Sequence, residues 1–336
     1  MSAARDHAPR AVVTALVDTG AGADLAAIAR DVEEAAAALG LTVHARRPLG
    51  PDAFELDAAL PASPAPPAPS APSAPSADAT HRIEARRLRR ELGAALAVRR
   101  PDTIVDLAVQ LDRPPPRAPR LFVMDMDSTV ITIEVIDELA RRHGVGAEVA
   151  AITARAMAGE LDFEASLRAR VARLAGLPAA VLDDVAGSLP LTDGAARLVR
   201  AVHALGGWTA IVSGGFTFGA EPLAARLGID HVAANRLAIA GGALTGELVG
   251  ELVVPTRKAE LVGELAAAHG LDLAHTVAIG DGANDLLMLA RAGLGVAFHG
   301  KPLVRAAADT AITRGGLDRV LQLVGLSAAD VDALAA

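Results

Sequence analysis

The sequence predicts an α/β domain built on a parallel sheet, preceded by a smaller α+β domain. Three observations carry this prediction. From Leu121 onward, the apolar runs "LFVM", "TAIV" and "TVAI" each end in a short polar or glycine-containing turn and lead into a helix, which is typical of parallel strands covered on both faces. A helix-rich block without strand signals, about 135–200, lies between the first two runs. A proline-rich tract at 61–77 interrupts the preceding part of the chain.

Residues 1–115 are expected to form the α+β domain. The expected strands are "AVVTALV", "LTVHARR", "FELDAAL" and "DTIVDLAVQL". Apolar residues at helical spacing predict one helix after the first strand and one after the third; they are Leu25, Ile28, Val32 and Leu39, and Ile83, Leu88, Leu92 and Leu96. This order resembles the ferredoxin-like arrangement of the small-molecule-sensing ACT domains, and a plain accessory domain is the alternative. The tract 61–77 is expected to be an extended linker inserted at one loop.

Length and composition set the broad class. The chain has 336 residues and 52% hydrophobic residues, so it can bury a large core. The absence of cysteine excludes disulfides and thiolate metal sites, and it leaves histidine, aspartate and glutamate as metal ligands. The apolar run before Asp18 is too short for a signal peptide or a membrane span. A cytoplasmic protein without a membrane partner is therefore expected.

The charge pattern argues against a nucleic-acid partner. The net charge is −8, and aromatic residues are only 2%, with no tyrosine to stack on bases. Seven arginines between 82 and 100 are interpreted as a solvated helix face. Of the 32 basic residues, only Lys258 and Lys301 are lysine. Since lysine and arginine are not interchangeable in tight sites, a retained lysine indicates a position that needs the compact ammonium, with chance as the alternative.

Acidic and small polar residues follow the three apolar runs, in "DMDST", "SGGF" and "GDGANDL". Ligands bind outside the carboxyl ends of parallel strands, so these turns are expected to converge. Asp125 and Asp127 are expected to point the same way from the strand end, where two ionised carboxylates need a cation. With Asp281 as a further oxygen ligand, the implied cation is Mg²⁺.

Each of these residues also has a structural interpretation. Asp127, Ser128 or Thr129 is able to cap the helix that follows. Asn284 or Asp285 is able to cap the helix "LLMLARAG". Ser213 and its two glycines are ordinary turn residues. The joint occurrence of all three sets at strand ends favours a site over caps and turns.

"DMDST", "SGGF", Lys258 in "TRKAEL" and "GDGANDL" occur in this order and resemble the four motifs of the haloacid-dehalogenase-like phosphatases. Within that superfamily the chain is similar to the phosphoserine phosphatase family, from 121 to about 325. The resemblance implies a Rossmann-like domain at 121–336 with a helical cap at about 135–200. It also implies hydrolysis of O-phospho-L-serine to L-serine, the last step of serine biosynthesis, through an aspartyl-phosphate.

The resemblance assigns the catalytic roles. Asp125 is the implied nucleophile and Asp127 the acid that protonates the leaving oxygen and then acts as base. The main-chain carbonyl of Asp127 and the side chains of Asp125 and Asp281 are the implied Mg²⁺ ligands. The remaining motif residues are implied to hold the phosphate; they are Ser213, Gly214, Lys258 and Asn284.

The resemblance also implies that residues of the cap determine substrate specificity. Glu134 matches the family's position for the ammonium group and Arg170 its position for the carboxylate, while Met157 and Phe163 match apolar cap residues. A helix-dipole acid and a surface arginine are the structural alternatives for Glu134 and Arg170.

Two other functions stay open at this point. One is a phosphatase or phosphotransferase for another small phosphomonoester, and the other is a non-catalytic amino-acid sensor. O-phosphoserine is the implied partner molecule, and the sequence allows a homodimer without fixing the oligomeric state.

Overall fold

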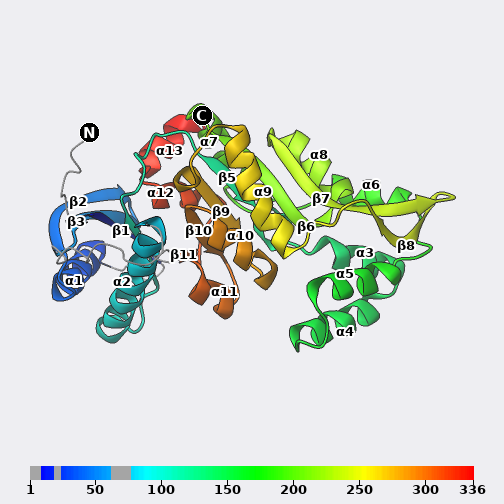
Figure 1. Cartoon of the computed structure of the whole chain (residues 1–336), viewed down its shortest axis with the longest axis horizontal. Coiled ribbons are helices and arrows are strands. Elements are labelled where there is room, and N and C mark those ends of the chain that lie inside the picture. The colour runs from blue at the N-terminus through cyan, green and yellow to red at the C-terminus, as the bar shows by residue number, and fades with distance from the viewer. Residues whose placement is uncertain (1–8, 19–23, 62–76) are drawn as a thin grey trace, which may run out of the picture. The chain divides into compact units, whose positions relative to one another are not determined.

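The computed structural model describes residues 9–18, 24–61 and 77–336 (Figure 1). The expected proline-rich linker lies, apart from its two end residues, outside the described residues. Contacts divide the chain into two compact units. The first unit comprises Met1–Arg117, Asp309–Arg314 and Arg319–Ala333, and the second comprises Ala118–Ala308, Gly315–Asp318 and Leu334–Ala336.

The first unit contains a four-stranded antiparallel sheet with the strand order β2-β3-β1-β4. Its elements are β1 (Arg10–Val17), α1 (Leu25–Ala38), β2 (Thr42–Gly50), β3 (Ala53–Ala59), α2 (Ala77–Arg99) and β4 (Val105–Leu111). The end of the chain adds β11 (Thr310–Ile312), α12 (Val320–Leu323) and most of α13 (Ala328–Leu334). The order of elements predicted for the amino-terminal part is confirmed, and the antiparallel sheet with two helices is compatible with an ACT-like domain.

The two helices of the first unit bury the apolar stripes that the sequence predicted. Ile28, Val32, Leu88 and Leu92 are at most 1% exposed and belong to one core with the strands. Ile83, which was counted with the stripe of α2, is 66% exposed. It lies five residues before Leu88, and at about 100° per residue this spacing turns it away from the buried face.

The arginines of α2 are largely held by ion pairs within the first unit. Arg86 Nε lies 2.7 Å from Asp309, which Arg82 also contacts. Arg87 pairs with Glu84 and Glu91. Arginines of this helix face therefore pair with carboxylates of their own unit.

The second unit is built on a parallel sheet, as predicted. The strands that this unit contributes have the order β10-β9-β5-β6-β7-β8. All neighbours pair in parallel except β7 and β8. Their bounds are β5 (Leu121–Met124), β6 (Trp208–Phe216), β7 (His231–Ala240), β8 (Ala243–Val249), β9 (Thr276–Gly280) and β10 (Leu294–Phe298). The predicted hairpin of β7 and β8 is confirmed, and its turn consists of Gly241 and Gly242, whose φ angles of 59° and 81° favour glycine.

Helices connect these strands, and the predicted helical block is confirmed. It contains α3 (Val135–His143), α4 (Gly146–Met157), α5 (Phe163–Ala172), α6 (Ala180–Gly187) and α7 (Ala195–Ala204). Figure 1 shows α3, α4 and α5 gathered in one group at one end of this unit. The later helices are α8 (Thr217–Leu227), α9 (Pro255–Ala268), α10 (Leu286–Arg291) and α11 (Pro302–Ala307). Among the described residues, no helix combines the length and apolar character needed to cross a membrane.

Candidate active site

The carboxyl ends of β5, β6 and β9 meet at a cavity of about 560 Å³. Helices of the cap supply another wall of this cavity, through residues of α4 and α5. Eight of the predicted site residues line it: Asp125, Asp127, Glu134, Arg170, Ser213, Gly214, Asp281 and Asn284. The ninth, Lys258, lies beneath the cavity surface and contacts Asp125. The structure thus brings all the predicted residues together at one edge of the sheet.

The turn after β5 sets the directions of Asp125 and Asp127. The strand ends at Met124, and Ser128 has a φ of 55° in the left-handed region. Asp125 and Asp127 both lie beyond the strand, so the turn and not strand alternation places them, and both line the cavity as expected. Asp127 Oδ1 accepts a hydrogen bond from the N–H of Val135 at 3.3 Å, so it does contact the first turn of α3 as the capping alternative proposed. A Cβ atom on Gly215 would lie 2.7 Å from Asp127 Oδ2, so only glycine leaves room for this carboxylate.

Lys258 is fully buried between two carboxylates. Its Nζ lies 3.0 Å from Asp125 Oδ1 and 2.6 Å from Asp285 Oδ1. Burial by itself lowers the pKa of Lys258, but the two carboxylates outweigh burial and raise this pKa. Asp285 Oδ2 also accepts the N–H of Gly282 at 3.0 Å. The sequence interpretation offered Asp285 only as a helix cap, yet its side chain makes no cap bond to α10 and belongs to the site.

Burial raises the pKa of the other carboxyl groups around Asp125. The pKa of Asp127 is held well above its usual range by burial and by the nearby charges of Glu134 and Asp125. Burial, with Asp125 and Asp285, raises the pKa of Asp281 to about 7. Burial and Asp125 raise the pKa of Asp285 to about 6, although Lys258 opposes them. The site therefore retains protons near neutral pH unless a cation takes their place.

Three carboxylates are close enough to hold a metal ion. One oxygen from each of Asp125, Asp281 and Asp285 lies within 4.8 Å of the others. An all-oxygen donor set suits a hard divalent cation such as Mg²⁺. The side chains of Asp125 and Asp281 were predicted as ligands, and Asp285, which was not predicted, is the third member of the cluster. The carboxylate of Asp127, whose main-chain carbonyl was the predicted ligand, is not part of it.

Ser213 and Gly214 lie at the carboxyl end of β6 in a tightly fixed backbone. Ser213 Oγ accepts the N–H of Gly215 at 2.9 Å. Asn235, which is fully buried on β7, donates to the carbonyl of Gly214 at 2.9 Å and accepts the N–H of Val253 at 2.8 Å. Asn235 thus holds the Gly214 backbone in place. No sequence pattern pointed to Asn235, because it occurs within an expected hairpin.

The cap wall of the cavity carries charges of both signs. Glu134 Oε1 accepts a hydrogen bond from Ser128 Oγ at 2.9 Å, and burial raises the pKa of Glu134. Burial lowers the pKa of Arg170, with Glu134 partly opposing that change. The ring of Phe163 lies 2.7 Å from the place where a Cβ atom on Gly214 would lie. The apolar cap residue Phe163 therefore closes directly on the backbone after Ser213.

Lys301 also lines this cavity. Its backbone N–H donates to the carbonyl of Asp281 at 3.2 Å, and its charge opposes the burial that raises the pKa of Asp281. Both lysines of the chain therefore lie at the same site. That only two basic residues are lysine had indicated positions that need an ammonium group, although the sequence assigned Lys301 no role.

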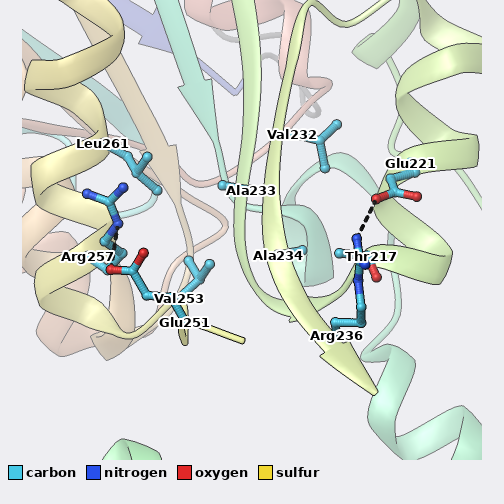
Figure 2. A pocket seen from close by; sticks show the side chains of 10 residues that line it. All are labelled: Thr217, Glu221, Val232, Ala233, Ala234, Arg236, Glu251, Val253, Arg257 and Leu261. Carbon is cyan, nitrogen blue, oxygen red and sulfur yellow. Dashed lines mark ion pairs between the residues drawn. The ribbon is translucent and has the colours of Figure 1, made fainter. Parts of the chain in front are cut away.

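A second, smaller cavity of about 260 Å³ lies among β7, α8 and α9 (Figure 2). Arg236 faces Glu221 on one side of it at 3.9 Å, and Arg257 faces Glu251 on the other at 3.4 Å. Each arginine is thus paired with a nearby glutamate, and these side chains are largely exposed except for Arg257. The first cavity, with its buried lysine and carboxylates, is the candidate active site.

Comparison with known proteins gives consistent results. The sequence profile of the haloacid dehalogenase-like hydrolase family matches residues 122–290. The chain is 51% identical over 242 residues to the phosphoserine phosphatase of Streptomyces coelicolor, covering 72% of this chain and 59% of that protein. It is 48% identical over 229 residues to that of Mycobacterium tuberculosis, covering 68% of this chain and 56% of that protein. The chain thus spans less than two thirds of the length of these relatives.

A solved structure extends the similarity beyond the cavity. The unliganded probable phosphoserine phosphatase from Vibrio cholerae superimposes with a TM-score of 0.63 and 35% sequence identity. The superposition covers 95% of this chain and 90% of that one. A coverage this high includes most of the first unit as well as the second.

We expect the affinity of the carboxylate cluster for a divalent cation to increase as the pH rises through about 6 to 7, the range of the pKa values of Asp285 and Asp281. The reason is that the cation must displace the protons that these raised pKa values retain. Titration calorimetry of the full chain with Mn²⁺ at two pH values on either side of this range measures the change. An Asp281→Asn variant should bind more weakly and with a smaller pH dependence. Equal affinity of the unmodified chain at both pH values would contradict this account of the cluster.

Proposed function

The chain belongs to the haloacid dehalogenase-like hydrolase family, and on that premise we propose that it is a Mg²⁺-dependent phosphatase that hydrolyses O-phospho-L-serine to L-serine and phosphate. The proposal depends on one observation: the buried Lys258 contacts both Asp125 and Asp285 at the cavity. Glu134 and Arg170 line the cap wall of the same cavity. The phosphoserine phosphatases of Streptomyces coelicolor and Mycobacterium tuberculosis support the substrate, being 51% and 48% identical to this chain.

The donor set fits the proposed metal. The clustered carboxylates of Asp125, Asp281 and Asp285 supply only oxygen atoms, which Mg²⁺ prefers. When bound, the ion would orient the phosphate and neutralise charge that develops on its oxygens. The main-chain carbonyl of Asp127 is the further ligand that the family resemblance implies.

The chemistry follows from the different states of two aspartates. Asp125 attacks phosphorus and forms an aspartyl-phosphate, while the bond to the seryl oxygen breaks. Asp127, whose pKa is raised well above its usual range by burial, gives its proton to that leaving oxygen. The ionised Asp127 then takes a proton from the water that attacks the aspartyl-phosphate, which releases phosphate and restores Asp125. Lys258 keeps the Asp125 carboxylate fixed throughout, since it is buried against it.

The remaining site residues bind the phosphate group and select the substrate. Ser213 and the Gly214 backbone hold phosphate oxygens, and Asn284, which lies 3.4 Å from Asp125 Oδ2, assists them. Arg170 accepts the substrate carboxylate as a bidentate partner, and Glu134 takes the ammonium group. Their charges are opposite and both line the cavity, as a phosphorylated amino acid requires.

The role of the first unit, the cytoplasmic location and the homodimer stay predictions from the sequence. The first unit is proposed as an ACT-like accessory domain, on the support of its strand order and its two helices. The cytoplasmic location and the homodimer have no further support. A purely sensing protein is disfavoured, because a scaffold has no need of carboxylates and a lysine buried together.

An Asp125→Asn variant is expected to lose phosphate release from O-phospho-L-serine by at least about 10³-fold, because the amide is no nucleophile. Phosphate is measured with saturating Mg²⁺, and circular dichroism checks that the variant is folded. Asp183→Asn is the matched control, since Asp183 is exposed on α6 and does not line the cavity. Turnover by Asp125→Asn close to that of this control would contradict the assignment of Asp125 as the nucleophile.

An Arg170→Met variant should separate phosphoserine from other phosphomonoesters. We expect kcat/KM for O-phosphoserine to fall roughly 10²-fold, because a charged hydrogen-bond partner of the carboxylate is lost. Phosphoethanolamine lacks the carboxylate, so its kcat/KM should change only several-fold. Arg168→Met on the same helix, where Arg168 pairs with Glu164, is the control and should behave like the unmodified chain. Equal losses on both substrates would refute the assignment of Arg170 and favour another small phosphomonoester.

A further inference from the structure

Two histidines and a tryptophan meet at the edge of the sheet opposite to the active site. Trp208 is the first residue of β6 and His231 the first residue of β7. His269 follows the last residue of α9, at its carboxyl end. Since the active site lies at the carboxyl ends of the parallel strands, these three residues at the amino ends form a separate feature of the second unit.

The two imidazoles point their nitrogens at each other. Nε2 of His231 lies 2.7 Å from Nε2 of His269, and the ring centroids are 5.0 Å apart. Trp208 stacks on the ring of His269, with centroids 4.2 Å apart and an interplanar angle of 23°. Both histidines are half-buried, so solvent reaches them. Trp208 stacks on His269 alone, and at 2.7 Å the two facing nitrogens have room for only one proton between them.

We propose that His231 and His269 form a binding site for a late first-row transition metal ion such as Zn²⁺, Ni²⁺ or Cu²⁺, with water completing the coordination. The ion takes the place of the shared proton. Two nitrogens at about 2.0–2.1 Å from one tetrahedral ion are roughly 3.3 Å apart. The two rings now face each other almost head-on, so the nitrogens have to separate and each ring has to rotate by roughly 35° to direct its lone pair at the ion. Imidazole nitrogen selects these metals, whereas Mg²⁺ prefers oxygen.

The surroundings of the pair agree with this assignment. Burial, and then the charge of His231, lowers the pKa of His269, although Asp230 opposes them. The neutral imidazole, which is the metal-binding form, is thus favoured at neutral pH. Asp230 is not counted as a ligand, because its Oδ2 is taken by His203 at 2.9 Å and by the N–H of Thr209 at 2.8 Å.

A metal at this pair would connect the end of α9 to the start of β7. The first turn of α9 carries Lys258, which contacts Asp125 in the active site. An ion that binds only the folded chain stabilises it by mass action. The inferred role of the site is therefore to stabilise the second unit, without participation in the chemistry.

The chain offers a direct readout, because Trp208 is its one tryptophan and it has no tyrosine. The experiment titrates Ni²⁺ or Cu²⁺ into the full chain in the presence of saturating Mg²⁺ and follows the fluorescence of Trp208. We expect saturable quenching with one equivalent of metal. His231→Gln removes a ligand without removing the ring that stacks on Trp208, and it should abolish the saturable quenching. His44→Gln, a change of an exposed histidine in the first unit, is the control and should quench like the unmodified chain.

Equilibrium dialysis with Zn²⁺ and saturating Mg²⁺ gives a second measurement that does not depend on fluorescence. The unmodified chain should bind one Zn²⁺ more than His231→Gln and should gain thermal stability from Zn²⁺, whereas the variant should gain less. Circular dichroism confirms that the variant is folded. Quenching that fails to saturate, or saturable quenching and equal Zn²⁺ binding that persist in His231→Gln, would overturn the proposal.

Discussion

The ammonium group of Lys258, buried between Asp125 and Asp285, is the interaction on which the rest of the site depends. Asp125 follows β5, Asp285 follows β9 and Lys258 belongs to α9, so this contact joins three connections of the parallel sheet at one point. None of the three side chains is more than 6% exposed. A charge in such a place is tolerated only while its partners remain. The same contact therefore stabilises the fold and holds the proposed nucleophile in one position.

Around this contact, the backbone and the cap give each carboxyl group its own environment. Asp125 is fixed by Lys258, whereas burial and neighbouring charges raise the pKa of Asp127. Separate environments for two carboxyl groups are what acid–base catalysis requires. Asn235 fixes the Gly214 backbone, and the absence of a side chain at Gly215 makes room for Asp127. The proposed phosphate site at the sheet edge is thus rigid, and we assign substrate specificity to the cap.

The sequence predicted the fold and most of the site because both depend on local patterns. Apolar runs followed by polar turns identified the parallel strands, and the motifs identified Asp125, Ser213 and Asp281. Asn235 was missed because its role arises only when β7 lies beside Gly214, a contact between distant residues. Asp285 was assigned to a helix cap because the chain alone does not show that Lys258 reaches it. Pair contacts of this kind come from tertiary packing, which periodicity and motif spacing do not encode.

A double-mutant cycle on Lys258 and Asp285 tests the central claim most directly. Unfolding by urea is followed through the fluorescence of Trp208, which lies in the second unit and reports on it alone. Lys258→Met should lower the free energy of unfolding by about 3–5 kcal/mol, because it leaves buried carboxylates without their cation. Adding Asp285→Asn to that variant should recover part of the loss, since it removes one orphaned charge. Losses that simply add, with no recovery in the double variant, would contradict the account.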